Sequence, residues 1–361
     1  MVDSMDTTLF IEIGQFVGAL AALIIIHELG HFVVARLFNI EVEEFGLGFP
    51  PRLATLFEAG GTKYTLNWIP LGGFVRPKGE NDPDVPGGLA AASPWVRLAV
   101  LAAGPLANLL VGVLLYTIIL SRIGAPIRDQ VQIIEVAPNS PAQQAGLRAV
   151  DLILEVNGQE INSTDDLQST IHDSLGEATT ITFQRDGQVQ EAVLTPRENP
   201  PEGEGAIGIV MSNPTRPISL VEALPRGVLG VFQHSRQILS FPVQMIQGDV
   251  SPEEGRFVGF KGMFDIYQEV RQSEPGPIVP SGVQVLGFFA TITISLGILN
   301  LLPIPALDGG RILFVLPEIV IGRRIPQEYE NVINLVSFAL LLVLLLYINL
   351  QDFVNPIELP R

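Results

Sequence analysis

The sequence predicts a multi-pass α-helical membrane protein with about four transmembrane helices, a membrane-associated β-hairpin region and one inserted α+β domain. The chain of 361 residues is 47% hydrophobic and only 16% charged, whereas a typical soluble domain is about 25% charged. It contains apolar runs long enough to cross a bilayer, and an acidic segment of alternating residues separates two of these runs. A large part of the chain is therefore expected to face lipid.

Four apolar stretches reach the roughly 18 residues that a helix needs to cross the hydrocarbon core. They run over Leu9–Phe38, Trp95–Leu120, Val283–Leu302 and Val332–Leu350. The first stretch follows acidic rather than basic residues and precedes no small-residue cleavage site. We therefore expect it to be retained and not removed as a signal peptide.

Lysine and arginine are unevenly distributed around these stretches. They gather between the first and second stretch and between the third and fourth: Arg36, Arg52, Lys63, Arg76 and Lys78, then Arg311, Arg323 and Arg324. Because basic loops stay in the cytoplasm, both loops are predicted to be cytoplasmic and both termini to lie outside.

The segment between the second and third stretch has a different composition. Residues 129–198 contain twelve acidic and three basic residues, a net charge of −9 out of −17 for the chain. Alternating runs predict β-strands, and Asn157-Gly158 and Asp186-Gly187 are typical of hairpin turns. Short helices are expected over Ser140–Gly146 and Thr164–Leu175, the second capped by Thr164 or Asp165.

Two motifs in this segment, NSPAQQAGL over residues 139–147 and DLILEVNG over residues 151–158, resemble a PDZ domain. The resemblance implies a groove beside a helix that takes up an extended peptide as an added strand. An inert acidic domain that only limits access is the alternative. One such unit is expected, because residues 199–280 lack a second pair of these motifs.

The resulting organisation has four parts. Residues 1–125 form a first membrane core, residues 126–200 the PDZ domain, residues 201–280 a linker with interfacial amphipathic helices, and residues 281–361 a second membrane core. Leu220–Gln247 carries too many polar residues to cross the membrane and is expected to lie at its surface.

Metal-ligating residues are scarce, since the chain has no cysteine and four histidines. His27 and His31 form an H-E-x-x-H motif, and residues four apart share one helix face, so both imidazoles can reach one cation. Glu28 lies beside them as a base for a metal-bound water. Nitrogen and oxygen ligands suit zinc, and ionisable residues inside an apolar run usually face an interior site.

A catalytic zinc needs a third protein ligand. His172 and His234 are poor candidates, because they lie in the predicted PDZ helix and in the interfacial segment. Asp308 follows two helix-breaking prolines and precedes paired glycines in NLLPIPALDGG over residues 300–310. A simple turn would explain this segment taken alone, but together with His27 and His31 the carboxylate is the favoured third ligand.

The segments HELGH (27–31), GPLAN (104–108) and NLLPIPALDGG resemble the site-2 protease family of intramembrane zinc metalloproteases, in particular the bacterial regulator of sigma-E protease branch. The resemblance implies that His27, His31 and Asp308 hold zinc and that Glu28 is the general base. It implies that Asn300 holds substrate backbone or the oxyanion. Pro105 and Asn108 would shape the second span beside the zinc helix, or simply pack there.

The resemblance also suggests a setting for the site. Phe45–Val75 is similar to the family's membrane-associated β-loop, with an ordinary cytoplasmic hairpin as the alternative. The zinc site would face the cytoplasmic side of a bacterial inner membrane, and the PDZ domain would lie outside it. The expected substrate is a single-span transmembrane protein, such as an anti-sigma factor, already shortened by another protease.

The predicted function is therefore zinc-dependent endopeptidase cleavage of transmembrane proteins within or near the bilayer. One alternative is a membrane PDZ scaffold with a non-catalytic metal site, and another is a different membrane H-E-x-x-H protease whose third ligand is a glutamate. The net charge of −17 argues against a nucleic-acid partner, which would require phosphate contacts from basic residues.

Overall fold

The computed structural model describes residues 2–201, 203–249, 256–273 and 279–356. The chain divides into two compact units. We call the first the membrane unit; it comprises Met1–Tyr116, Leu224–Ser273 and Gln284–Arg361. We call the second the inserted unit; it comprises Thr117–Ala223 and Glu274–Val283.

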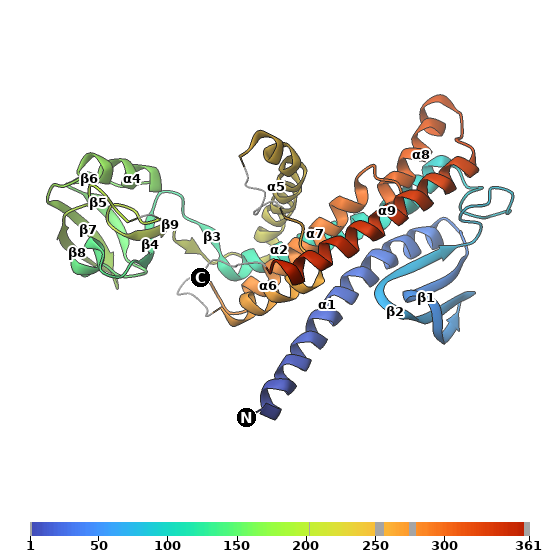
Figure 1. Ribbon diagram of the computed structural model, residues 1–361. Helices are drawn as coiled ribbons and strands as arrows, with labels where there is room; N and C mark the ends of the chain where they lie inside the picture. The colour runs from blue at the N-terminus through green and yellow to red at the C-terminus, as the bar shows by residue number, and fades with distance from the viewer. Residues whose placement is uncertain (1, 202, 250–255, 274–278, 357–361) are drawn as a thin grey trace. The chain divides into compact units, whose positions relative to one another are not determined.

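Four long apolar helices correspond to the four predicted spans. They are α1 (Val2–Leu37), α2 (Pro94–Ile123), α7 (Val283–Leu301) and α9 (Gln327–Val354) (Figure 1). None of the residues in the most apolar stretch of α9 is buried, and 39% of the corresponding stretch of α2 is buried. Outward apolar side chains of this extent are typical of helices in lipid, so the predicted set of four apolar helices is confirmed.

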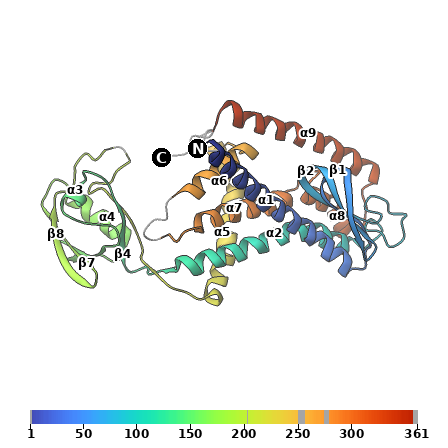
Figure 2. The ribbon, with the colours of Figure 1, turned by 90° about the horizontal axis from the view of Figure 1, so that it is seen from below.

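A small β-sheet lies beside the carboxyl end of α1 in both views (Figures 1 and 2). Its strands β1 (Val42–Ala59) and β2 (Thr62–Pro77) are antiparallel, and each folds back on itself, so that Gly46 pairs with both Phe74 and Thr65. The sheet therefore has the order 73–77, 42–49, 62–69 and 52–59. The strand segment 73–77 forms one edge of this sheet.

Glu44 joins three parts of this sheet from a buried position. Its carboxylate accepts hydrogen bonds from Thr65 at 2.8 Å and Arg52 at 2.8 Å, and it also pairs with Arg76. Burial raises the pKa of Glu44, but the hydrogen bonds from Thr65 and Arg52 and the charge of Arg76 outweigh it and hold the pKa below its ordinary value. Glu44 therefore stays ionised and ties the folded-back strands together.

Helix α8 (Asp308–Ile321) was not among the predicted elements, because its residues were assigned to the loop between the last two spans. It begins at Asp308 and ends at Ile321, and the following Gly322, with a φ of 68°, forms the left-handed cap that favours glycine. Tertiary ion pairs hold it: Glu318 pairs with Arg97 of α2, and Arg311 donates to Glu80 at 2.5 Å. Such partners are invisible in a local sequence pattern.

The predicted interfacial segment forms one continuous helix, α5 (Leu220–Gln247), which passes through Pro225 and Pro242. Helix α6 (Phe260–Gln272) follows it and contacts both α1 and α9. In α9, Asp352 accepts the backbone N–H of Gly262 at 2.9 Å. The carboxylate thus satisfies a helix N–H that has no intrahelical partner.

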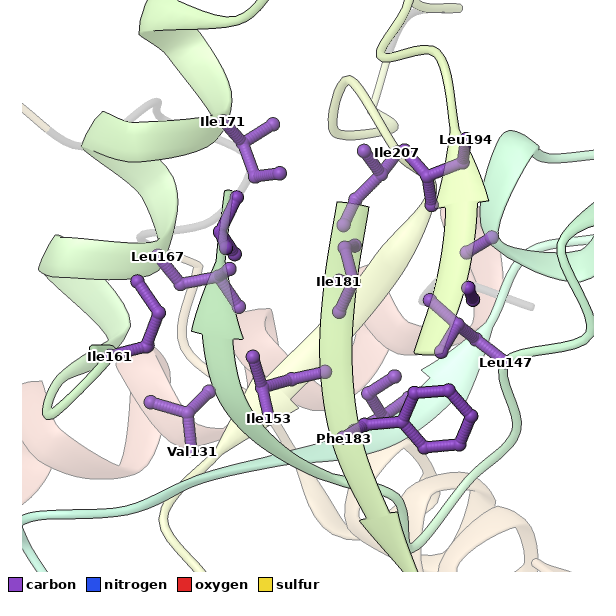
Figure 3. Packing of buried hydrophobic residues seen from close by; sticks show 14 residues of the cluster. Val131, Leu147, Ile153, Ile161, Leu167, Ile171, Ile181, Phe183, Leu194 and Ile207 are labelled. Atoms are coloured by element: carbon purple, nitrogen blue, oxygen red, sulfur yellow. The ribbon is translucent and has the colours of Figure 1, made fainter. Parts of the chain in front are cut away.

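The inserted unit is an antiparallel sheet packed against a helix. The strand order is β8-β7-β5-β4-β9. These strands are β8 (Gln188–Leu194), β7 (Thr179–Arg185), β5 (Leu152–Val156), β4 (Val131–Val136) and β9 (Ile209–Ser212). Of the short strands, β6 (Gln159–Glu160) pairs with β5, and β3 (Ala125–Pro126) pairs with β10 (Thr215–Arg216). Leu167 and Ile171 of α4 (Thr164–Asp173) pack over Ile153 and Ile181 of the sheet (Figure 3). This apolar layer is the core of the unit.

Local details of the inserted unit differ from the sequence prediction at three points. The first helix, α3 (Pro141–Gln144), is shorter than predicted. The cap of α4 is Ser163, whose hydroxyl accepts from the N–H of Asp166 at 3.1 Å, and not Thr164 or Asp165. Only a residue with an extended backbone can turn its side chain back onto the first turn, and Ser163 has a φ of −147°. Strand β9 continues the sheet past residue 200.

Candidate metal centre

Two histidines one helical turn apart and an aspartate distant from them in sequence meet inside the membrane unit. Nε2 of His27 lies 3.1 Å from Oδ2 of Asp308, and Nε2 of His31 lies 3.4 Å from the same oxygen. The two Nε2 atoms are 3.2 Å apart. The histidines lie on α1, one turn apart, and Asp308 is the first residue of α8. The three atoms therefore form a nearly equilateral triangle.

The dimensions of this triangle suit a tetrahedral metal ion. Zinc bonds to imidazole nitrogen and carboxylate oxygen are about 2.0–2.2 Å long, which places two tetrahedral ligands about 3.3–3.5 Å apart. The three measured separations of 3.1, 3.4 and 3.2 Å match one face of such a tetrahedron. Two imidazoles and one carboxylate are also a typical donor set for zinc with a fourth position open, so the residues fit this ion.

Each histidine is oriented by a partner on α2. Nδ1–H of His31 donates to the backbone oxygen of Val100 at 2.7 Å, and Nδ1 of His27 contacts the side-chain amide of Asn108 at 3.2 Å. A fully buried Asn108 can serve as acceptor when its amide oxygen, which has no other partner, faces Nδ1. Both Nε2 atoms then keep a lone pair for a metal.

Two glycines allow α1 and α2 to approach closely at this point. A Cβ atom on Gly104 would lie 2.2 Å from Nε2 of His31, and one on Gly30 would lie 2.4 Å from the backbone oxygen of Ala103. Real Cβ contacts are never this short, so any larger residue at either position would displace the imidazole or the helix. The motif segments HELGH and GPLAN thus supply the space around the imidazoles as well as the two histidines themselves.

Glu28 lines the same cavity as His27, His31 and Asp308. The cavity has a volume of about 340 Å³, and its walls include His27, His31, Asp308 and Asn300. The backbone N–H of Val75 donates to the Glu28 carboxylate. The edge segment 73–77 of the small sheet therefore runs directly beside this carboxylate.

Asn300 lies in the cavity wall at the carboxyl end of α7. Its Nδ2 donates to the backbone oxygen of Leu296 at 2.9 Å, so one of its two amide hydrogens is already used within the helix. The two histidines that were set aside lie elsewhere: His172 is in α4 of the inserted unit, and His234 of α5 contacts the hydroxyl of Tyr116 at 2.9 Å.

Two charged residues of the cavity wall were missed by the sequence analysis. Arg311 of α8 and Glu80 of the segment between β2 and α2 form an ion pair at 2.5 Å. Burial lowers the pKa of the Arg311 guanidinium, but Glu80 and Asp308 outweigh it and hold the pKa above its ordinary value. Arg311 follows Asp308 by one helical turn, and this spacing is the only sequence signal that points to it.

The inserted unit has a separate groove. It lies between α4 and β9, with a volume of about 410 Å³, and apolar side chains of Leu167, Ile171, Ile207 and Ile209 line it together with Arg197. Because β9 is the last strand of the sheet, its outer edge carries backbone groups available for a further strand.

Comparison with known proteins decides the family. The model of peptidase family M50 matches residues 15–344. The chain belongs to peptidase family M50. It is 26% identical over 433 residues to the zinc metalloprotease RasP of Geobacillus kaustophilus, with 98% of this chain and 99% of that protein covered. It is 35% identical over 364 residues to a Campylobacter jejuni protein that carries a provisional zinc metalloprotease name, covering 95% and 93% of the two chains.

Solved structures similar to this M50 chain include PDZ domains of Listeria proteins. One from Listeria monocytogenes is 26% identical and covers 23% of this chain and 87% of that one, with a TM-score of 0.21. The PDZ domain of an SdrC-like protein from Listeria innocua is 28% identical and covers 24% of this chain and 96% of that one, also with a TM-score of 0.21. The M50 family and the named relatives identify the chain as a zinc metalloprotease of the membrane.

Proposed function

We propose that this M50 zinc metalloprotease is an intramembrane endopeptidase that cleaves transmembrane proteins within or near the bilayer. The observation that carries the proposal is the triangle of His27, His31 and Asp308 beside Glu28, built within a unit of four long apolar helices. A hydrolytic site among such helices suits a substrate that enters from the membrane.

His27, His31 and Asp308 are proposed to hold the zinc, and Glu28 to act as the general base. When bound, zinc supplies a Lewis acid that polarises the scissile carbonyl and makes water a stronger acid. Glu28 accepts a proton from the attacking water and delivers it to the leaving amine. Asn300 is proposed to contact the substrate backbone with the amide hydrogen that is not bonded to the Leu296 oxygen.

The small β-sheet is proposed to hold the substrate in extended form. A transmembrane helix satisfies its own backbone hydrogen bonds and must unwind before its carbonyls can react. Within the described residues, the edge segment 73–77 beside Glu28 pairs with a strand on one side only. Its outer backbone groups other than the Val75 N–H, which donates to Glu28, are proposed to replace some of the lost bonds. This arrangement supports cleavage of an unwound segment.

The groove between α4 and β9 is proposed to bind an extended peptide, as a PDZ domain does. Its apolar walls and open strand edge support this role. The alternative, in which the inserted unit only restricts access, predicts that peptides with apolar ends do not bind it. Titration of the full chain with such peptides separates the two.

The orientation of the chain is also a proposal. The basic residues between the first and second spans and between the third and fourth spans support a cytoplasmic zinc site in a bacterial inner membrane, with the inserted unit outside. The proposed substrate is a single-span protein, such as an anti-sigma factor, shortened beforehand by another protease. Cysteine labelling from each side of the membrane at exposed positions of the inserted unit tests the sidedness.

The proposed function is tested with a single-span reporter protein, truncated on its extracytoplasmic side and expressed with this chain. We expect Glu28→Gln to abolish cleavage while zinc content stays at the wild-type level, because the three proposed ligands remain. Glu328→Gln, an isosteric change at an exposed position of α9, is the control and should cleave normally. Equal cleavage by Glu28→Gln and wild type would refute the role of Glu28 as general base and favour the alternative of a membrane PDZ scaffold with a non-catalytic metal site.

A further inference from the structure

The wall of the metal cavity contains one permanently charged basic side chain among the described residues. Among the described residues of the wall, Arg311 is the only lysine or arginine. The same wall contains three carboxylates, those of Glu28, Glu80 and Asp308. With a divalent ion bound, the ion and one guanidinium balance these three negative charges. A further negative charge in the cavity would share its wall with the guanidinium of Arg311.

Arg311 is fixed both at its backbone and at its guanidinium. Its backbone lies one turn after Asp308 on α8, and its Nη1 donates to Glu80 at 2.5 Å. Among the described residues, no hydrogen bond engages its Nε or Nη2. Arginine presents its donors in a rigid planar fork that matches a carboxylate, and Arg311, whose fork is only partly engaged by Glu80, is one of the residues that line the cavity.

Hydrolysis of a peptide bond produces the anion that such a fork recognises. The oxygen of water bonds to the scissile carbonyl carbon, the C–N bond breaks, and the leaving nitrogen takes up the two water protons to become an ammonium. The other product ends in a carboxylate. Asn300 uses one of its two Nδ2 hydrogens on the oxygen of Leu296, so it can offer this group one neutral donor and no charge.

We propose that Arg311 is a substrate-binding residue that holds the acyl oxygens of the cleaved residue and then the new carboxylate, with Glu80 keeping the guanidinium in place. The inference rests on the proposed peptidase function and adds to it a second charged contact to the acyl side of the substrate. Glu80 is a positioning residue in this scheme, since it acts through Arg311.

The alternative role of Arg311 is structural, because the ion pair also ties the segment 78–93 to α8. Arg324 provides a matched control: it donates to the backbone oxygen of Ala90 in the same segment at 2.7 Å but does not line the metal cavity. A purely structural tie predicts that Arg311→Gln and Arg324→Gln have the same effect.

The test measures binding of two product mimics to the zinc-loaded full chain in detergent by calorimetry. The mimics are N-acetyl-leucyl-leucine, which ends in a carboxylate, and its C-terminal amide. We expect Arg311→Gln to keep its zinc but to lower the preference for the carboxylate over the amide by about tenfold or more, the loss expected for a charged hydrogen bond. Arg324→Gln should keep the wild-type preference.

Exchanging the charges of Glu80 and Arg311 distinguishes a substrate-binding role of Arg311 from a role in tying the segment 78–93 to α8. The double variant Glu80→Arg with Arg311→Glu restores an ion pair between the segment and α8 but moves the cation away from α8. We expect it not to restore the preference for the carboxylate. An unchanged preference in Arg311→Gln, loss of zinc in that variant, or rescue by the exchange would overturn the proposal. Binding is measured without turnover, so the result is independent of the Glu28→Gln cleavage test.

Discussion

Replacing Asn108 by alanine tests how far the metal centre depends on residues that do not touch the ion. The Asn108 side chain is fully buried and lies 3.2 Å from Nδ1 of His27. With the amide oxygen facing Nδ1, removal of the side chain leaves a buried imidazole N–H without an acceptor, which costs about 1–3 kcal/mol. Loss of such an outer partner typically weakens metal affinity by 10–100-fold, or about 1.4–2.8 kcal/mol. We therefore expect the zinc dissociation constant to rise by this factor.

The measurement is a competition titration of zinc against a chelator with the purified chain in detergent. Asn108→Asp keeps an acceptor next to His27 and should bind zinc at least as tightly as wild type. Leu109→Ala, on the same helix, removes partly buried apolar volume without touching a proposed ligand and should leave the affinity unchanged. A dissociation constant for Asn108→Ala within twofold of wild type would refute the argument that the amide orients His27.

Three further predictions follow from the described contacts. Gly104→Ala should lower bound zinc in elemental analysis, since the new Cβ would fall 2.2 Å from Nε2 of His31, whereas Gly18→Ala, with open space around it, should not. Asp308→Ala should lose most zinc; retention of a full equivalent would mean that another carboxylate is the third ligand. Asp151→Ala should destabilise the inserted unit by roughly 3 kcal/mol, because its buried carboxylate accepts from Arg185 at 2.6 Å. Hydrogen exchange at β5 and β7 in the full chain measures that loss, and unchanged protection there would contradict it.

The membrane-spanning helices could be predicted because their signal is local. A run of about twenty apolar residues specifies a helix in lipid whatever its neighbours are, and the predicted run Val283–Leu302 differs from α7 by one residue at its end. Helix α8 lacks such a signal. It is shorter, contains Pro317 and is held by Arg97 and Glu80 from distant parts of the chain.

The residues of the metal centre divide in the same way. His27 and His31 are paired by helical spacing, and Asp308 was found because metal-binding side chains are scarce and its neighbours break the helix. The role of Asn108 was left open between packing and the site, and the Val100 oxygen has no side-chain signal at all. Their contacts with the imidazoles depend on how α2 crosses α1.

Sequence alone was sufficient for the four spans, the inserted β-rich segment and the donor types of a zinc site, because hydrophobic length, residue alternation and ligand chemistry are properties of short segments. Only the tertiary structure decided that Asp308 completes a triangle with sides of 3.1, 3.4 and 3.2 Å and that Arg311 shares its cavity. Those positions depend on helix crossings that Gly30 and Gly104 permit and on ion pairs across more than two hundred residues, and no local pattern encodes them.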